Sequence, residues 1–277
     1  MSLALSSVKL LLGRAFLPLS IAVLGEGSNG NTAAFQCGIR QLPRDYNEDV
    51  PADRRAWLVH ERLLQTYGSP RWRPSLPPLE ELLSTILSQN TNDLNRDRAF
   101  AALQAQFPTW QAVRDAPSQA VIDTIRPAGL APQKGPRIQR LLHQITEECG
   151  GLDLAFLRQA PPEDVYAWLT HFDGVGPKTA SIVMLFSLQM PAFPVDTHVY
   201  RLTGRLGLRP QTITADQAHR VLAEAFPPEA YFAAHLNLIR HGREICRARK
   251  PACHACSLLD LCDFGRAALA DAGRRAA

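Results

Sequence analysis

Apolar residues recur every three or four positions along most of the chain after the linker at Gly25–Asn31, and no stretch sustains an alternation of apolar and polar positions. The first spacing is that of one face of an α-helix, whereas alternation would indicate a β-strand. An all-α protein is therefore predicted. The expected helices are Asp53–Tyr67, Pro78–Ser88, Leu94–Gln106, Trp110–Ala116, Gln119–Ile125, Gln133–Glu148, Leu154–Gln159, Pro162–His171, Pro177–Leu188, Thr197–Leu206, Ala215–Ala225 and Glu229–Cys246.

The first 45 residues do not share this pattern and are predicted to be an extension that is disordered or that precedes the true start. Their longest clean apolar run, Ala15–Leu24, is about half the roughly 20 residues that a membrane-spanning helix needs. A signal peptide is a second interpretation, but no clean Ala-x-Ala cleavage site follows the run. We expect no membrane association and a cytoplasmic location.

Composition bounds the size of the folded part. With 277 residues, 46% hydrophobic and 20% charged, the chain can form one large domain or two small ones. Its net charge of +4 does not by itself indicate a polyanionic partner, because a net value says nothing about where the charges lie. Residues 267–277 are small and charged, and a flexible tail is predicted there.

A two-glycine turn joins two of the predicted helices. Between Phe172 and Pro177 it contains Gly174, Val175 and Gly176, and glycine permits backbone conformations that a Cβ would obstruct. The exposed N–H groups of such a turn and the positive end of the next helix can bind a phosphate oxygen. A plain connection between two helices is the alternative interpretation.

Two charged residues flank the helix that follows this turn. Pro177 suits the first helical position, which places Lys178 in the first turn, where the helix dipole disfavours an ammonium. Lys178 is therefore a candidate nucleophile, and a phosphate-binding lysine is the alternative. Asp196 precedes the next apolar-periodic segment as a candidate N-cap, and its carboxylate could also face a developing cation.

Four of the six cysteines follow one another within seventeen residues, with the spacing Cys-x6-Cys-x2-Cys-x5-Cys. Such clustering indicates a metal or cluster site in a reducing compartment rather than a disulfide framework. Four thiolates at these intervals could hold a [4Fe–4S] cluster or a zinc ion. The predicted ligands are Cys246, Cys253, Cys256 and Cys262.

Basic residues lie between the first two cysteines. Arg247, Arg249 and Lys250 stand there, next to Arg243 and opposed only by Glu244. A basic loop held by a cluster would present a rigid surface to phosphates. These three residues are candidate DNA contacts.

The combination of these features, in this order, resembles the endonuclease III family of DNA glycosylases. The motifs that carry the resemblance are Gly-Val-Gly-Pro-Lys-Thr-Ala at 174–180, Val-Asp-Thr-His at 195–198 and the four cysteines. It covers roughly Asp53 to Asp263 and implies two α-domains with a DNA-binding cleft between them. A six-helix barrel with the helix-hairpin-helix would span 77–190, and residues 46–76 and 191–266 would form the cluster domain.

The resemblance also implies a chemistry. Lys178 would attack C1′ of a damaged nucleotide, displace the base and form a Schiff base, and Asp196 would stabilise the cationic sugar. Elimination at C3′ would then nick the strand. The implied cofactor is a [4Fe–4S] cluster, and the implied partner is double-stranded DNA with damaged or abasic sites, bound by a monomer associated with the nucleoid.

Two loops depart from the family pattern. Where relatives place an amide side chain to fill the gap left by an everted base, either Gln89 or Asn90 could act. In the second intercalating loop Leu130 is a candidate wedge, or alternatively makes an apolar contact that caps a helix, and Ala131 and Pro132 offer less bulk than the family pattern.

Three functions follow from these interpretations. The first is a glycosylase and abasic-site lyase that removes oxidised pyrimidines. The second keeps the fold but acts on uracil or thymine mispaired with guanine. The third is a protein with weak catalysis that binds abasic or bent DNA.

Overall fold

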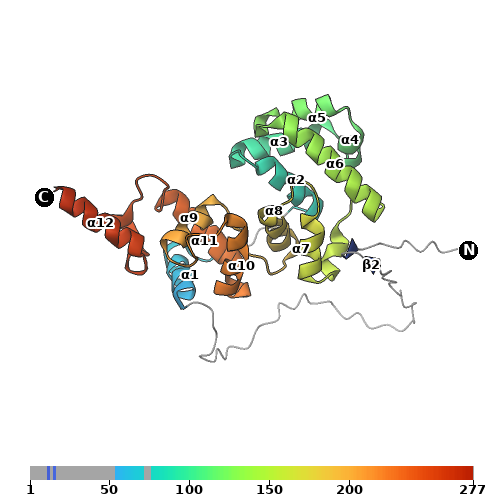
Figure 1. The fold of residues 1–277 in the computed structure, drawn as a ribbon. Coiled ribbons are helices and arrows are strands. Elements are labelled where there is room, and N and C mark those ends of the chain that lie inside the picture. The colour runs from blue at the N-terminus through green and yellow to red at the C-terminus, as the bar shows by residue number, and fades with distance from the viewer. Residues whose placement is uncertain (1–10, 13–14, 17–53, 72–75, 277) are drawn as a thin grey trace, which may run out of the picture. The chain divides into compact units, whose positions relative to one another are not determined.

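A computed structural model of the chain describes residues 11–12, 15–16, 54–71 and 76–276 (Figure 1). The chain divides into two units, Met1–Pro51 and Ala52–Ala277. In the first, the described residues form two short strands, β1 (Leu11–Leu12) and β2 (Ala15–Phe16), which pair antiparallel. The rest of the predicted N-terminal extension lies outside the described residues. No described helix is long and apolar enough to cross a membrane.

The described part of the second unit is helical, which confirms the predicted fold class. Its α-helices are α1 (Arg54–Tyr67), α2 (Pro78–Ser88), α3 (Asp93–Gln106), α4 (Trp110–Asp115), α5 (Ser118–Thr124), α6 (Ala131–Cys149), α7 (Pro162–Thr170), α8 (Pro177–Ile182), α9 (Thr197–Arg205), α10 (Ala215–Ala225), α11 (Tyr231–Glu244) and α12 (Asp263–Ala276). Short 3₁₀ turns are η1 (Arg126–Ala128), η2 (Ala155–Gln159), η4 (Pro228–Ala230), η5 (Cys253–Ala255) and η6 (Leu259–Leu261), and η3 (Val183–Leu188) is a π-helix.

Three predicted helices differ in type or extent. The segment predicted at 154–159 is the 3₁₀ turn η2, a form common in such short pieces. The helix predicted over 177–188 is α-helical only to Ile182 and continues as the π-helix η3, whose end is marked by Gln189 in the left-handed region at φ 58°. The helix predicted from Glu229 begins at Tyr231, after a 3₁₀ turn that Pro228 starts.

A further helix occupies the segment predicted to be a flexible tail. Helix α12 spans Asp263–Ala276, although no helix was expected after Cys246. The segment Ala-Ala-Leu-Ala at 267–270 explains this, because alanine and leucine have the highest intrinsic helix propensities.

The apolar side chains form two cores. One draws on α2 through α8, with fully buried residues such as Leu83, Ile86 and Ile138. The other joins α1 to α9, α10 and α11, and it includes two of the predicted metal ligands, Cys246 and Cys262. Helix α1 packs against α11 although it is far from it in sequence (Figure 1). The loops that carry the candidate site therefore extend from two separately packed groups of helices.

Candidate active site and metal centre

The turn between α7 and α8 has the conformation that its glycines suggest. Gly174 lies at φ 79°, and a Cβ there would come within 2.4 Å of the Arg137 side chain. The amide of Val175 donates to the Phe172 carbonyl at 3.1 Å, and the Val175 side chain is buried. Gly176 is exposed and caps α8, and Pro177 takes the first helical position. The predicted hairpin is thus present, with its glycines at the surface beside α6.

The two candidate reactive groups stand at the starts of successive helices. Lys178 is exposed in the first turn of α8. Asp196 is half-buried and is the N-cap of α9, where its Oδ1 accepts a hydrogen bond of 2.7 Å from the Val199 amide. This bond fixes one carboxylate oxygen and orients the other.

Two buried histidines contact the segment that precedes Asp196. His235 of α11 donates from Nδ1 to the Pro194 carbonyl at 2.9 Å, and His219 of α10 donates from Nδ1 to the Phe193 carbonyl at 3.0 Å. The carbonyls only accept, so each Nδ1 must carry the hydrogen. These contacts hold the two residues that lead to Asp196 through Val195. Sequence patterns did not single out either histidine, because a lone histidine on an apolar helix carries no motif.

The charges of both candidate reactive groups act on His235. Burial lowers the pKa of His235 to about 4, the Asp196 carboxylate opposes that shift, and the charges of Lys178 and His219 add to it. Charges influence a buried group strongly because little water screens them. Lys178 and Asp196 are therefore both near enough to His235 to affect its protonation.

The low pKa of His235 predicts an acid-dependent loss of stability. In the unfolded chain His235 has a pKa near 6.5 and binds a proton at a pH where the folded protein does not. The free energy of unfolding therefore falls as the pH drops from about 6.5 to about 4. For His235 alone we expect a loss of about 2 kcal/mol between pH 7 and pH 5. His235→Gln keeps a hydrogen-bond donor but does not titrate. Its free energy of unfolding, measured with urea at pH 7 and pH 5, should therefore fall by about 2 kcal/mol less than that of the wild type. An unchanged difference would show that His235 does not titrate in this range.

The amide that could fill a flipped-base gap is one of two neighbours with different environments. Gln89 is half-buried, donates from Nε2 to the Gly174 carbonyl at 3.1 Å, and accepts from Arg137 Nη1 at 3.4 Å. Asn90 is exposed and lies in the left-handed region at φ 54°. Since the Gln89 amide is engaged within the protein, the geometry favours Asn90 as the projecting residue.

The candidate wedge projects from the start of α6. Leu130 is 45% exposed, which is high for a leucine, and lies at φ 52°, directly after Gly129 at φ 65°. Ala131 is buried, whereas Leu130, Pro132 and Gln133 offer exposed side chains to a partner here. An exposed side chain does not fit the alternative of an apolar capping contact.

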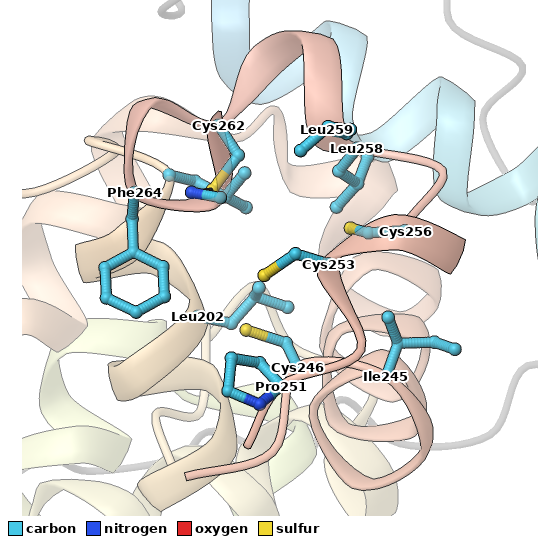
Figure 2. Close-up of a pocket in the computed structure, with 12 residues that line it drawn as sticks. Leu202, Ile245, Cys246, Pro251, Cys253, Cys256, Leu258, Leu259, Cys262 and Phe264 are labelled. Atoms are coloured by element: carbon cyan, nitrogen blue, oxygen red, sulfur yellow. Dashed lines mark hydrogen bonds between the residues drawn. The ribbon is translucent and has the colours of Figure 1, made fainter. Parts of the chain in front are cut away.

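The four predicted metal ligands line one pocket. Figure 2 shows the side chains of Cys246, Cys253, Cys256 and Cys262 around an open space, with Leu202, Pro251 and Phe264 at its border. The other lining residues are apolar or glycine. Four thiols around a cavity of this kind fit an iron-sulfur cluster, whose irons are held by cysteine thiolates.

Hydrogen-bond donors point at three of the sulfurs. Arg205 Nη1 donates to Cys246 Sγ at 3.2 Å, the Gly265 amide donates to Cys262 Sγ at 3.3 Å, and His241 Nε2 lies 3.3 Å from Cys256 Sγ. Burial raises the pKa of the Cys256 thiol to about 11, so the thiolate needs a cationic metal centre. Donors of this kind stabilise cluster thiolates. The residues therefore fit the predicted cofactor.

Two arginines of α9 hold the loop between the first two cysteines. Arg201 Nη2 donates to the Cys246 carbonyl at 3.0 Å, and Arg205 donates to the carbonyls of Arg247 and Ala248 at 2.8 and 3.0 Å. These residues were missed in the sequence, where their only signal is a spacing of four on one helix. They fix the loop backbone by hydrogen bonds to its carbonyls.

The predicted basic contacts are all at the surface. Arg247, Arg249 and Lys250 are exposed, and Lys250 lies at φ 52°. Their charges are therefore available to a polyanion from a backbone that is held in place.

Comparisons with known proteins agree with this set of features. Residues 83–228 match the HhH-GPD superfamily of base excision DNA repair proteins, and residues 246–262 match the iron-sulfur binding domain of endonuclease III. A candidate DNA glycosylase of Arabidopsis thaliana is 41% identical over 172 residues, which cover 62% of this chain and 59% of that protein. Endonuclease III of Thermotoga maritima is 32% identical over 197 residues, 71% of this chain and 88% of that protein.

A solved structure extends the likeness to the fold. The structure of a trapped endonuclease III–DNA covalent intermediate, an estranged-adenine complex, aligns with a TM-score of 0.67 at 26% identity. The alignment covers 77% of this chain and 96% of that chain. The similarity thus includes both groups of helices from which the candidate loops extend.

Proposed function

Because the chain belongs to the endonuclease III family of base excision DNA repair glycosylases, we propose that it removes oxidised pyrimidines from duplex DNA and nicks the resulting abasic site through a lysine Schiff base. The class, a DNA glycosylase and abasic-site lyase with a [4Fe–4S] cluster, follows from the family. The finer proposal is supported by the positions of Lys178 in the first turn of α8 and Asp196 at the N-cap of α9, and by the influence of both charges on the buried His235.

The proposed reaction begins at the sugar. The amine of Lys178 attacks C1′ of an everted nucleotide, the bond from C1′ to the base breaks, and the base leaves with the electron pair and takes up a proton. The lysine nitrogen then forms an imine with C1′ while the ring oxygen takes a proton and the sugar opens. Loss of a proton from C2′ expels the phosphate at C3′ and nicks the strand.

Asp196 is proposed to stabilise the positive charge on the sugar in this sequence. Its N-cap bond to Val199 fixes the carboxylate before the substrate arrives, so little reorganisation is needed when the charge develops. A relative trapped covalently on DNA supports a nucleophile on the protein.

The DNA contacts are assigned to four loops. The backbone of Gly174–Gly176 and the side chains of Arg247, Arg249 and Lys250 are proposed to bind phosphates, which positions the duplex without reading its sequence. Asn90 is proposed to fill the gap left by the everted base, and Leu130 to separate the neighbouring bases. The proposed active form is a monomer that binds one lesion. Its proposed location is the nucleoid, where its DNA substrate lies.

A second candidate function is favoured by the small second loop. Because Ala131 is buried and Pro132 is compact, this loop leaves more room beside the lesion than the family pattern does. Such room suits uracil or thymine opposite guanine, where an intact partner base must be accommodated. The third candidate, a weakly catalytic DNA-binding protein, would retain binding and show no covalent chemistry.

A lesion panel under single-turnover conditions tests these proposals. We expect base release from duplexes with an oxidised pyrimidine to be at least about tenfold faster than from duplexes with uracil or thymine opposite guanine. Borohydride should trap a covalent complex only while an imine is present. Faster release of the mispaired bases would favour the second function, and binding without trapping on abasic DNA would favour the third.

A further inference from the structure

A buried lysine that has no carboxylate partner among the described residues stands at the start of α6. Lys134 is 2% exposed, the fourth residue of the helix, and burial lowers the pKa of its ammonium. Its Nζ donates to the carbonyls of Leu87 at 2.7 Å and of Ala128 at 2.8 Å. A lysine is rarely buried without a counter-charge, because its desolvation is costly. Its two contacts therefore need an explanation other than a gain in stability alone.

Each of the two carbonyls lies in the last turn of a helical element, just before a loop that is a candidate DNA contact. Leu87 is the second-last residue of α2, and the loop with Gln89 and Asn90 follows. Ala128 is the last residue of η1, and the loop with Leu130 follows. Carbonyls at helix ends lack partners within the helix and attract a cation. One ammonium thus binds the carbonyls that precede two loops, and these loops are 40 residues apart in the chain.

Both loops hold a residue in the left-handed backbone region, Asn90 at φ 54° and Leu130 at φ 52°. Asparagine adopts this conformation more readily than other residues, whereas for Leu130 it costs about 1 to 2 kcal/mol. Such strain persists only where surrounding structure imposes it, and it gathers at functional sites. Lys134 holds the carbonyl three residues before Asn90 and the carbonyl two residues before Leu130.

The next turn of α6 extends the same support to the hairpin. Arg137 Nη1 donates to Gln89 Oε1 at 3.4 Å, and Gln89 Nε2 donates to the Gly174 carbonyl at 3.1 Å. The Arg137 side chain also packs on Gly174. Through Lys134 and Arg137, the start of α6 contacts all three loops.

We propose that Lys134 is a positioning residue for base eversion, which holds the Asn90 loop and the Leu130 loop at a fixed separation so that both side chains enter the duplex together. This inference rests on the proposed function, since it requires a lesion to be everted. Lys134 acts only through the loops and takes no part in the reaction at C1′. Its loss should therefore impair eversion more than the cleavage of an abasic site that has no base to evert.

The chain offers a matched control on the same helix. Gln139 is 9% exposed and donates from Nε2 to the carbonyls of Val113 at 3.1 Å and Ala116 at 2.8 Å, at the end of α4. Gln139→Met and Lys134→Met both remove a buried donor that joins α6 to backbone carbonyls. Only Lys134→Met removes contacts to the residues that precede the Asn90 loop and the Leu130 loop.

The test uses a duplex with a tetrahydrofuran abasic analogue and 2-aminopurine opposite it. The analogue has no aldehyde at C1′, so the fluorescence increase of 2-aminopurine reports unstacking without reaction. We expect wild type and Gln139→Met to give the same increase at saturating protein and Lys134→Met to lose most of it. Base release by Lys134→Met should also fall about tenfold or more, while nicking of a preformed abasic site stays within about threefold.

The outcomes separate this inference from the proposed function. No fluorescence change and no nicking with wild type would contradict the proposed function. With an active wild type, an unchanged Lys134→Met, or an equal loss in Gln139→Met, would overturn the positioning role. If Lys134→Met does not fold, Lys134→Gln, which keeps an amide donor, takes its place with an intermediate loss expected. Collapse of both variants would assign Lys134 to stability alone and overturn the proposal.

Discussion

Replacing Lys178 by glutamine should abolish borohydride trapping and lower the rate of strand nicking on the order of 10³-fold or more, as expected for loss of a covalent nucleophile. The amide of glutamine is not nucleophilic and cannot form an imine with C1′. Because Lys178 is exposed, the melting temperature should change little. Single-turnover nicking of abasic DNA and denaturing gels after borohydride measure both effects.

Asp196→Asn is the companion variant. Asparagine is as good an N-cap as aspartate, so the bond to the Val199 amide and the start of α9 should survive. Loss of the negative charge should slow nicking roughly 10²-fold, as removal of one electrostatic stabiliser does in other enzymes. Trapping that survives in Lys178→Gln would move the nucleophile elsewhere, and full activity in Asp196→Asn would remove the carboxylate from the chemistry.

Loss of the cluster is the second large effect we expect. Cys256→Ser replaces one of the four ligands around the cavity and should remove the broad absorption that thiolate-to-iron charge transfer gives near roughly 400 nm. The basic loop then loses part of its support, and phosphate contacts by Arg247, Arg249 and Lys250 weaken. If all three contacts are lost, the slope of log K against log salt should become shallower by about 3, since each contact contributes about 0.9.

His254→Ala is the matched control for this change. His254 lies between the ligands Cys253 and Cys256 but is exposed, so its loss should leave the colour, the melting temperature and the salt slope unaltered. A Cys256→Ser protein that binds DNA with the wild-type affinity and salt slope would show that the loop does not depend on the cluster. A colourless wild-type protein with stoichiometric zinc would contradict the assigned cofactor.

Local patterns predicted well those features that depend on neighbours in the chain. The helical period identified most helices, because side chains three and four residues apart share one face whatever the helix packs against. The glycine turn at 174–176 and the spacing of the cysteines are equally local. Helix α12 was not predicted, because the small and charged residues of this segment are also typical of a flexible tail; its alanine-rich sequence nevertheless favours a helix.

Other features depended on contacts across long stretches of chain. Asn90 is exposed, whereas the Gln89 amide is engaged by Gly174, 85 residues away. Lys134 was predicted only as a residue of the helix 133–148, yet the packing of α6 against α2 buries its ammonium on two carbonyls. No spacing rule identifies a residue whose partners are brought to it by tertiary packing.

By itself, the amino-acid sequence determined that this chain is helical, that it carries a lysine and an aspartate at two helix starts, and that four cysteines can hold a cluster. Those properties follow from periodicity, capping and ligand spacing, which act over a few residues. Only the tertiary structure decided that the charges of Lys178 and Asp196 both act on His235 and that α6 supports three loops. Such convergence requires separate helices to pack together, and packing joins residues that no local pattern relates.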